Sequence, residues 1–253
     1  MSSLRTNKIL PILIPVIGAI LVAIITGYFS LQANIKPVQI SIQATLNAQE
    51  VATSITNPLF NQPVTWTEKS LNASKLWPVF NDDQQNLYSI DTGFEKGTYL
   101  INASVFDKRR AYSLRSNMPT LSDFVYNATL NQTKGSDDEY FGIGFRMSSK
   151  GYYRLIVNRQ GNYALDRYNM DQNTYSRLLF STDRDLINEK GDNTLGVLAK
   201  SSRIQISING TLLGDTIDDS PIDSGIVGII VELDPGQSIS LGLEGYSVSI
   251  INN

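Results

Sequence analysis

Three patterns of hydrophobic and polar positions follow one another along the chain. Residues 9–29 are apolar without a single charge, and residues 30–60 place apolar side chains mostly three or four positions apart. From about residue 61 onward, apolar and polar residues alternate, as in GTYLINASVF at 97–106. A period of two is typical of β-strands with one buried face, and a period near 3.6 is typical of helices. The chain therefore divides into an apolar segment, a spacer and a β domain.

The apolar segment at 9–29 has the length of a membrane-spanning helix. At about 1.5 Å per residue, its 21 residues reach across a hydrocarbon core of about 30 Å. It is longer than the apolar part of a typical signal peptide, and no A-x-A-like cleavage site follows it. Arg5 and Lys8 precede it, and basic residues gather on the cytoplasmic side of membrane helices. We therefore expect a cytoplasmic head at 1–8, a single uncleaved anchor in the lipid bilayer of the cell membrane at 9–29, and an extracytoplasmic remainder.

Residues 30–60 predict a stalk between the anchor and the β domain. Leu31, Ile35, Val38 and Ile42 recur at helical spacing, but Pro37 interrupts the pattern early. Two interpretations stay open. The segment is either a partly helical stalk that packs on a neighbour, or a plain spacer.

The region 61–253 is expected to be all β. Asn209-Gly210, between RIQISI and TLLGDTI, is the strongest hairpin signal, because a type I′ turn needs a positive φ at both positions. Lys150-Gly151, Gln160-Gly161 and Asp234-Pro235-Gly236 mark further turns. About a dozen short strands without a helix predict an antiparallel two-sheet jelly-roll sandwich. The alternating runs cover residues 97–106, 122–130, 141–145, 153–157, 161–168, 176–180, 194–199, 203–208, 211–217, 225–232 and 238–251.

The composition removes many kinds of chemistry. The chain contains no Cys and no His, which excludes thiol nucleophiles, disulfides, zinc fingers, His-based catalytic triads and His-ligated metals. Its formal net charge is −3, so no basic surface stands ready for a phosphate backbone, and nucleic acid is not an expected partner. Any reaction would have to use carboxylates, Tyr, Ser with Lys, or an oxygen-bound cation.

Several strand runs resemble those of a known superfamily. In order they are Leu76-Trp77-Pro78, Asp82-Asp83, GTYLINASV, SDFVYNATL, YFGIGFR, GYYRLIVNRQGNYALDRY, NTLGVLAKSSRIQISINGTLL and SGIVGIIVE. Over about residues 64–251 this order resembles the concanavalin A-like lectin/glucanase superfamily, and more narrowly its laminin-G-like jelly rolls. The resemblance implies a two-sheet sandwich with a concave face that binds glycan or protein, in some members with a structural calcium ion. Laminarinase-type members use a Glu-x-Asp-x-x-Glu strand motif, which this sequence does not contain, so the resemblance implies no enzymatic activity.

Aromatic and basic residues in the middle of the β domain are the candidate ligand-binding residues, because sugars stack on ring faces. Alternation places Tyr152 and Arg154 on one strand face, and Tyr163 and Arg167 together on another. Arg146 stands opposite the apolar residues of its own strand and should point away from the core. We expect these five residues to line a concave surface, with core or edge packing of the tyrosines as the alternative.

Calcium is the one cofactor that the sequence suggests. Acidic loops offer the oxygen ligands that hard cations prefer. The candidate ligands are Asp82, Asp83, Asp218 and Asp219, although none of their loops matches an EF-hand. The alternative is that these are ordinary acidic turns and that the protein holds no cofactor.

These features together predict a membrane-anchored, non-catalytic binding or scaffolding module for a glycan or a protein. One alternative is an accessory subunit of a larger membrane complex, favoured by Ala19, Ala23 and Gly27 at four-residue spacing in the anchor. The other is a carboxylate-based glycoside hydrolase, which needs two carboxyl groups about 5 to 9.5 Å apart. Of the seven glutamates, only Glu232 and Glu244 fall within predicted strands. We therefore expect the protein not to be an enzyme.

Overall fold

The computed structural model describes residues 66–68, 71 and 74–251. The head, anchor and stalk that we predict at 1–8, 9–29 and 30–60 lie outside these residues. Within the described part, no helix is long and apolar enough to cross a membrane. The helical structure found there is one short 3-10 turn, η1 (Arg184–Leu186), so the described region is built from strands and loops.

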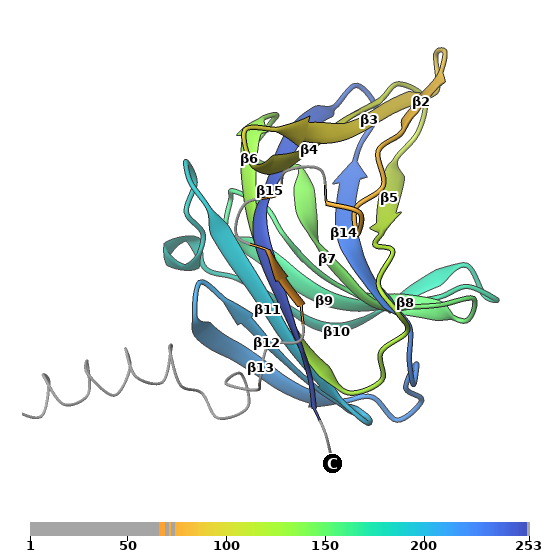
Figure 1. The fold of residues 1–253 in the computed structure, drawn as a ribbon, viewed down its shortest axis with the longest axis vertical. Coiled ribbons are helices and arrows are strands. Elements are labelled where there is room, and N and C mark those ends of the chain that lie inside the picture. Colours follow the sequence, from red (N-terminus) through yellow and green to blue (C-terminus); the bar gives the residue numbers. More distant parts are fainter. Residues whose placement is uncertain (1–65, 69–70, 72–73, 252–253) are drawn as a thin grey trace, which may run out of the picture. The chain divides into compact units, whose positions relative to one another are not determined.

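The larger sheet of the described region contains nine antiparallel strands (Figure 1). Its strands lie in the order β13-β12-β11-β6-β15-β4-β3-β2, and β1 pairs with β15 beside this path. They are β1 (Trp66–Glu68), β2 (Asn81–Gln84), β3 (Tyr88–Glu95), β4 (Thr98–Val105), β6 (Phe124–Lys134), β11 (Asn193–Lys200), β12 (Arg203–Ile208), β13 (Thr211–Ile217) and β15 (Ser238–Ile250).

The second sheet contains six antiparallel strands in the order β10-β9-β8-β7-β14-β5. They are β5 (Arg110–Arg115), β7 (Tyr140–Met147), β8 (Gly151–Val157), β9 (Asn162–Asn169), β10 (Thr174–Thr182) and β14 (Ile226–Leu233). The chain crosses from one sheet to the other several times, as the colours of Figure 1 show. The prediction of an all-β, two-sheet antiparallel sandwich is therefore confirmed for the described residues.

The main hydrophobic core fills the space between the two sheets. In β4, Tyr99 and Ile101 are fully buried, and in β7, Phe141, Ile143 and Phe145 are fully buried as well. These are the positions that the period-two pattern assigns to the inner face. Burial of large apolar side chains at about 1.5–3 kcal/mol each supplies the main stabilisation of such a sandwich.

Turns and strand limits agree with the sequence best where the local signal is strong. The strands β12 and β13 have the predicted limits, and the turn between them has φ of 50° at Asn209 and 82° at Gly210, as a type I′ turn requires. The sequence analysis missed β1, β2, β3 and β5. The strands β2 and β5 lie at sheet edges, where few side chains are buried and the alternation of apolar and polar residues is weak.

The outer face of the six-stranded sheet carries a second, smaller set of buried side chains. Met147, Tyr152, Ile156, Ala164 and Ile230 pack together there, each at most 5% exposed. An outward-facing position in a two-layer sandwich is normally open to solvent. On this face the side chains cover one another instead, and they enclose charged groups between them.

Candidate functional site

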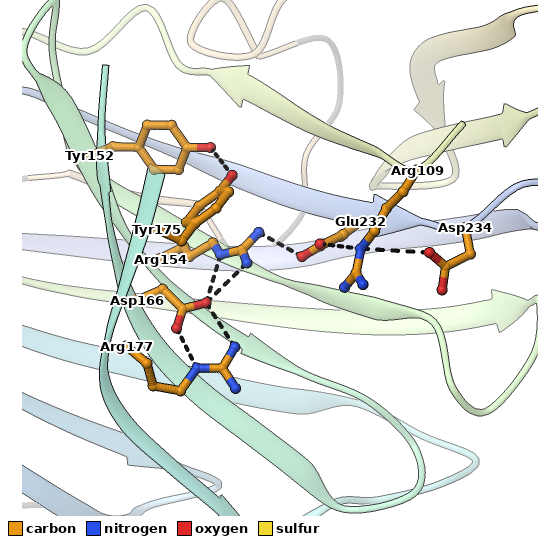
Figure 2. A network of polar contacts seen from close by, with 8 residues as sticks. All are labelled: Arg109, Tyr152, Arg154, Asp166, Tyr175, Arg177, Glu232 and Asp234. Atoms are coloured by element: carbon orange, nitrogen blue, oxygen red, sulfur yellow. Dashed lines mark hydrogen bonds and ion pairs between the residues drawn. The ribbon is translucent and has the colours of Figure 1, made fainter. Parts of the chain in front are cut away.

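A buried guanidinium links three strands across the outer face of the six-stranded sheet. Arg154 of β8 is 3% exposed, and its Nε donates to Asp166 Oδ2 of β9 at 3.0 Å. Its Nη1 donates to Glu232 Oε2 of β14 at 2.6 Å. Because β7 lies between β8 and β14, the side chain must cross that strand, where Gly142 and Gly144 put no side chain in its way. Figure 2 shows the resulting chain of contacts.

Further groups extend the network at its β10 end. Arg177 donates from Nε to Asp166 Oδ1 at 2.7 Å, so Asp166 accepts from two guanidiniums. The Arg154 guanidinium lies 3.9 Å from the centre of the Tyr175 ring, and the Tyr175 and Tyr152 hydroxyl groups are 2.7 Å apart. Burial disfavours the charged form of Arg154, but the negative charges of Glu232 and Asp166 outweigh this effect and raise its pKa. Arg154 is therefore a permanent cation.

At the other end, one arginine bridges two carboxylates. Arg109 donates from Nε to Glu232 Oε1 at 2.7 Å, and the same nitrogen lies 3.6 Å from Asp234 Oδ1. These two oxygens are therefore at most 6.3 Å apart, so their separation does not exceed that of glycosidase carboxyl pairs, roughly 5–9.5 Å. The Glu232 side chain is 9% exposed, whereas those of Asp234 and Arg109 are each 56% exposed. A buried carboxylate thus stands beside an exposed one.

The sequence contained a partial signal for this pair. Glu232-Leu233-Asp234 repeats the first two positions of Glu-x-Asp-x-x-Glu, and Gln237 stands where the last Glu would be. The strand β14 ends at Leu233, so the second half of the pattern falls in a turn, where Gln237 Oε1 accepts from the Asp234 amide at 2.7 Å. Sequence reasoning noted Glu232 only as a strand carboxylate, and it missed Asp166, Arg177 and Asp234.

The five predicted ligand-binding residues separate into groups. Tyr152 and Arg154 lie on the outer face, within the network. Tyr163 and Arg167 share a strand face, as predicted, but it is the face toward the core. Tyr163 is 6% exposed and packs in the main core, and Arg167 Nη1 forms an ion pair with Asp218 at 3.2 Å. The structure therefore brings two of the five to a common outer surface.

Arg146 requires a correction, because we expected it to point outward onto the binding surface. It is fully buried, and its guanidinium donates to the backbone carbonyls of Ser122, Ser201 and Ile222. Its φ of 47° interrupts the regular alternation near the end of β7, which is why the periodic pattern assigned it the wrong surroundings. Arg146 holds three loop segments together.

The predicted calcium ligands are not gathered in one place. Asp82 and Asp83 lie on β2, and Asp218 and Asp219 follow β13, while β2 and β13 stand at opposite ends of the nine-stranded sheet. Asp218 accepts from the Tyr153 hydroxyl at 2.6 Å and pairs with Arg167. Among the residues that the structure describes, no group of three or more acidic side chains is placed to hold a metal ion. The four aspartates therefore lie in two separate places of the sheet, and calcium binding stays a prediction.

Comparisons with known proteins identify the fold. No family model and no curated protein matches the sequence. Among solved structures, the catalytic domain of an endo-1,3-β-glucanase (laminarinase) from Thermotoga petrophila has a TM-score of 0.55 at 8% identity, covering 76% of this chain and 99% of that one. A Bacillus licheniformis β-glucanase has a TM-score of 0.55 at 9% identity, covering 75% and 99%. A lichenase derived from a mouse hindgut metagenome has a TM-score of 0.51 at 10% identity, covering 74% and 99%.

At these identities the likeness establishes the fold, which is the concanavalin A-like jelly-roll sandwich that the sequence resemblance implied. It also corrects the functional expectation. Glucanases are among the solved structures that share this fold, which contradicts the prediction of a non-catalytic module that is not an enzyme.

Proposed function

We propose that the chain is a glycoside hydrolase that cleaves a glycan at the outer face of the six-stranded sheet. The observation that carries the proposal is the pair of carboxylates bridged by Arg109, one buried and one exposed, with oxygens at most 6.3 Å apart. Hydrolysis of a glycosidic bond needs two carboxyl groups at such a separation, one on each side of the bond.

The different surroundings of the two carboxylates suit different roles. Glu232 accepts from Arg109 at one oxygen and from Arg154 at the other, which fixes the orientation of its side chain. We assign Glu232 as the nucleophile, or as the carboxylate that stabilises the positive charge developing on the sugar in the transition state. Asp234 is exposed to solvent, so we assign it as the acid that protonates the leaving oxygen and as the base that then activates water.

The remainder of the network positions Glu232. Arg154 is itself held by Asp166, and Asp166 by Arg177, so the orientation of the guanidinium is fixed from two neighbouring strands. A reacting group must be held within about 0.5 Å of its productive position, and supporting hydrogen bonds of this kind provide that precision. Arg154 is therefore a positioning residue.

Exposed aromatic rings on the same face support a glycan as substrate. Tyr175 is 41% exposed and Phe180 is 52% exposed, and both lie on β10 beside the network. Sugars stack their apolar faces on such rings. The laminarinase, β-glucanase and lichenase activities named for the structures that share the fold point to a β-glucan. The anchor predicted at 9–29 would hold this activity outside the cell membrane.

The test is release of reducing ends from laminarin and lichenan by the full chain in mild detergent. Asp234→Asn should lower kcat by about 100-fold or more, because the proton donor is lost, and should leave the thermal unfolding temperature unchanged, because the side chain is exposed. Asp192→Asn makes the same change in an exposed loop before β11 and should keep the wild-type rate. Glu232→Gln should also inactivate, with some loss of stability. Absence of cleavage by the wild type, or full activity of Asp234→Asn, would overturn the proposal.

A further inference from the structure

The Tyr175 ring lies against the guanidinium that holds Glu232. The Arg154 guanidinium is 3.9 Å from the centre of this ring, within the distance of a cation–π contact, and its Nη1 donates to Glu232 Oε2 at 2.6 Å. The ring centre is therefore at most about 8 Å from Glu232 Oε2, since the C–N bond of the guanidinium adds about 1.3 Å. Figure 2 shows Tyr175 between Tyr152 and Arg154. Tyr175 is thus one contact removed from Glu232.

Neighbouring strands hold the Tyr175 ring in place. Strand register puts Tyr152 of β8, Tyr168 of β9 and Tyr175 of β10 next to one another on the outer face. The Tyr168 and Tyr175 ring centres are 4.7 Å apart, and the Tyr152 and Tyr175 hydroxyl groups are 2.7 Å apart. Tyr168 in turn donates to Asn173 Oδ1 at 2.6 Å. Aromatic pairs at such distances attract each other, so Tyr175 is held in the orientation that covers Arg154.

Tyr175 is the open side of this contact. It is 41% exposed, whereas Arg154 is 3% and Tyr152 is 5% exposed. The two carboxylates that accept from Arg154, those of Asp166 and Glu232, are buried as well. Of these groups, Tyr175 is therefore the one that a sugar can reach from solvent.

A sugar on the Tyr175 ring changes the strength of its contact with Arg154. Sugars place their apolar faces on aromatic rings and remove water from them. A cation–π contact is weak at an exposed site and stronger where water is excluded. Covering Tyr175 therefore strengthens its attraction for the Arg154 guanidinium. A guanidinium that moves less holds Glu232 Oε2 more firmly.

Phe180 offers a similar ring surface without this direct connection. It also lies on β10, and strand register places it on the outer face. It is 52% exposed, and the Arg177 guanidinium lies 5.1 Å from its ring centre. Between Arg177 and Glu232 stand Asp166 and Arg154. A sugar on Phe180 is therefore bound by a ring that acts on Glu232 much less directly than Tyr175 does.

We propose that Tyr175 couples sugar binding to cleavage: a sugar on its ring fixes Arg154, and Arg154 fixes Glu232. The inference rests on the proposed function and adds a specificity-determining residue to it. Glycan chains long enough to cover Tyr175 are cleaved with a higher kcat than shorter chains, because the position of Glu232 is improved as well as the affinity. Tyr175 binds the sugar, and toward Glu232 it is a positioning residue.

The test measures kcat and KM separately for the full chain in mild detergent, on β-glucan oligosaccharides from the disaccharide to the hexasaccharide. For the wild type, kcat should rise in a step at the length that first covers Tyr175. Tyr175→Leu should remove this step and lower kcat on the hexasaccharide by about 10-fold, the factor between an exposed and a water-free cation–π contact. Tyr175→Phe keeps the ring over Arg154 and should keep the step. Phe180→Leu, the matched control on the same strand, should raise KM for long chains and also keep the step.

The ratio of kcat on long and short chains is taken within each variant, so a smaller folded fraction does not affect it. Three results would overturn the inference and leave the proposed function in place: a wild-type kcat that does not change with chain length, a step that Tyr175→Leu keeps, or a step that Phe180→Leu loses as well. Loss of the step in Tyr175→Phe would also count against the ring as the coupling group. Absence of cleavage of every chain would instead remove the proposed function, and the inference with it.

Discussion

At the scale of single residues, the charged groups of the outer face differ from those at the surface in how much water reaches them. Arg154 pairs with Asp166 and Glu232 while nearly fully buried. Arg203 also pairs with a carboxylate, that of Asp215, but both side chains are about half exposed. Water screens an exposed pair and can replace its hydrogen bonds. Loss of one partner therefore costs more stability at the buried Arg154 than at the exposed Arg203.

Replacing Arg154 by Met should therefore lower the free energy of unfolding by about 3–5 kcal/mol, since two buried carboxylates each lose a partner. Arg203→Met should leave the unfolding temperature almost unchanged, because its partner is solvated. Urea unfolding of both variants at neutral pH measures the difference. A similar small effect at both positions would mean that the buried network does not stabilise the fold.

Glu139 predicts a dependence of stability on pH. It is 2% exposed and accepts from Gln132 Nε2 at 3.2 Å, and burial raises its pKa above the ordinary 4.5. The folded state then binds a proton more tightly than the unfolded state, so this contribution to stability is complete below about pH 4.5 and is lost as the pH rises through the folded pKa. Between pH 4 and 8, the unfolding temperature of Glu139→Gln should rise relative to that of the wild type as the pH increases.

Glu189→Gln, at an exposed position, supplies the control for the loss of one charge. A constant difference between Glu139→Gln and the wild type over the whole range would contradict the assignment of Glu139 as a buried acid.

The sheet face of a residue could be predicted where it follows from the alternation of apolar and polar positions. The surroundings of a residue could not be predicted where they are formed by side chains from several strands. Tyr152 and Arg154 share the outer face, as alternation requires. Alternation gives only the side of the sheet, however, and it says nothing of whether that side is covered. The burial of Asp166 depends on Arg154 and Arg177 from the strands on either side of β9, and this meeting is fixed by register across the sheet.

At the scale of elements, β7 packs closely against the backbone of its neighbour. A Cβ added at Gly142 would lie 2.0 Å from the carbonyl oxygen of Leu155 in β8. Gly142→Ala should therefore destabilise the protein by about 1–3 kcal/mol, the range for overpacking a filled site. Gly93 of β3 has no atom within 4 Å of an added Cβ, so Gly93→Ala should stay within about 0.5 kcal/mol of the wild type. Thermal unfolding compares the two variants, and equal effects would contradict this packing.

Elements were predictable where the chain itself encodes the turn. The hairpin of β12 and β13 was predicted with its limits, because Asn209 and Gly210 adopt positive φ locally. The edge strand β5 was missed, because only Leu114 is fully buried in RAYSLR and no alternation results. Edge strands form by pairing with a sheet that already exists, and this information lies in other parts of the sequence.

At the scale of the whole molecule, the strands and the two buried clusters that the structure describes lie between residues 66 and 250. A fragment of residues 57–253 should therefore unfold at the same temperature as the full chain and cleave the same glycans. The anchor at 9–29 stays a prediction, and the fragment tests it as well. The full chain should sediment with membranes and the fragment should stay in the supernatant, whereas equal partitioning of both would contradict the anchor.

The balance of charge in the buried network determines how ligands approach the molecule. Arg109, Arg154 and Arg177 are matched by Asp166, Glu232 and Asp234, so the network of Figure 2 carries no net charge. Beyond a Debye length of about 8 Å its field vanishes, and it exerts no long-range attraction. A glycan is therefore not drawn to the outer face over long distances, and its association rate there should change little with ionic strength.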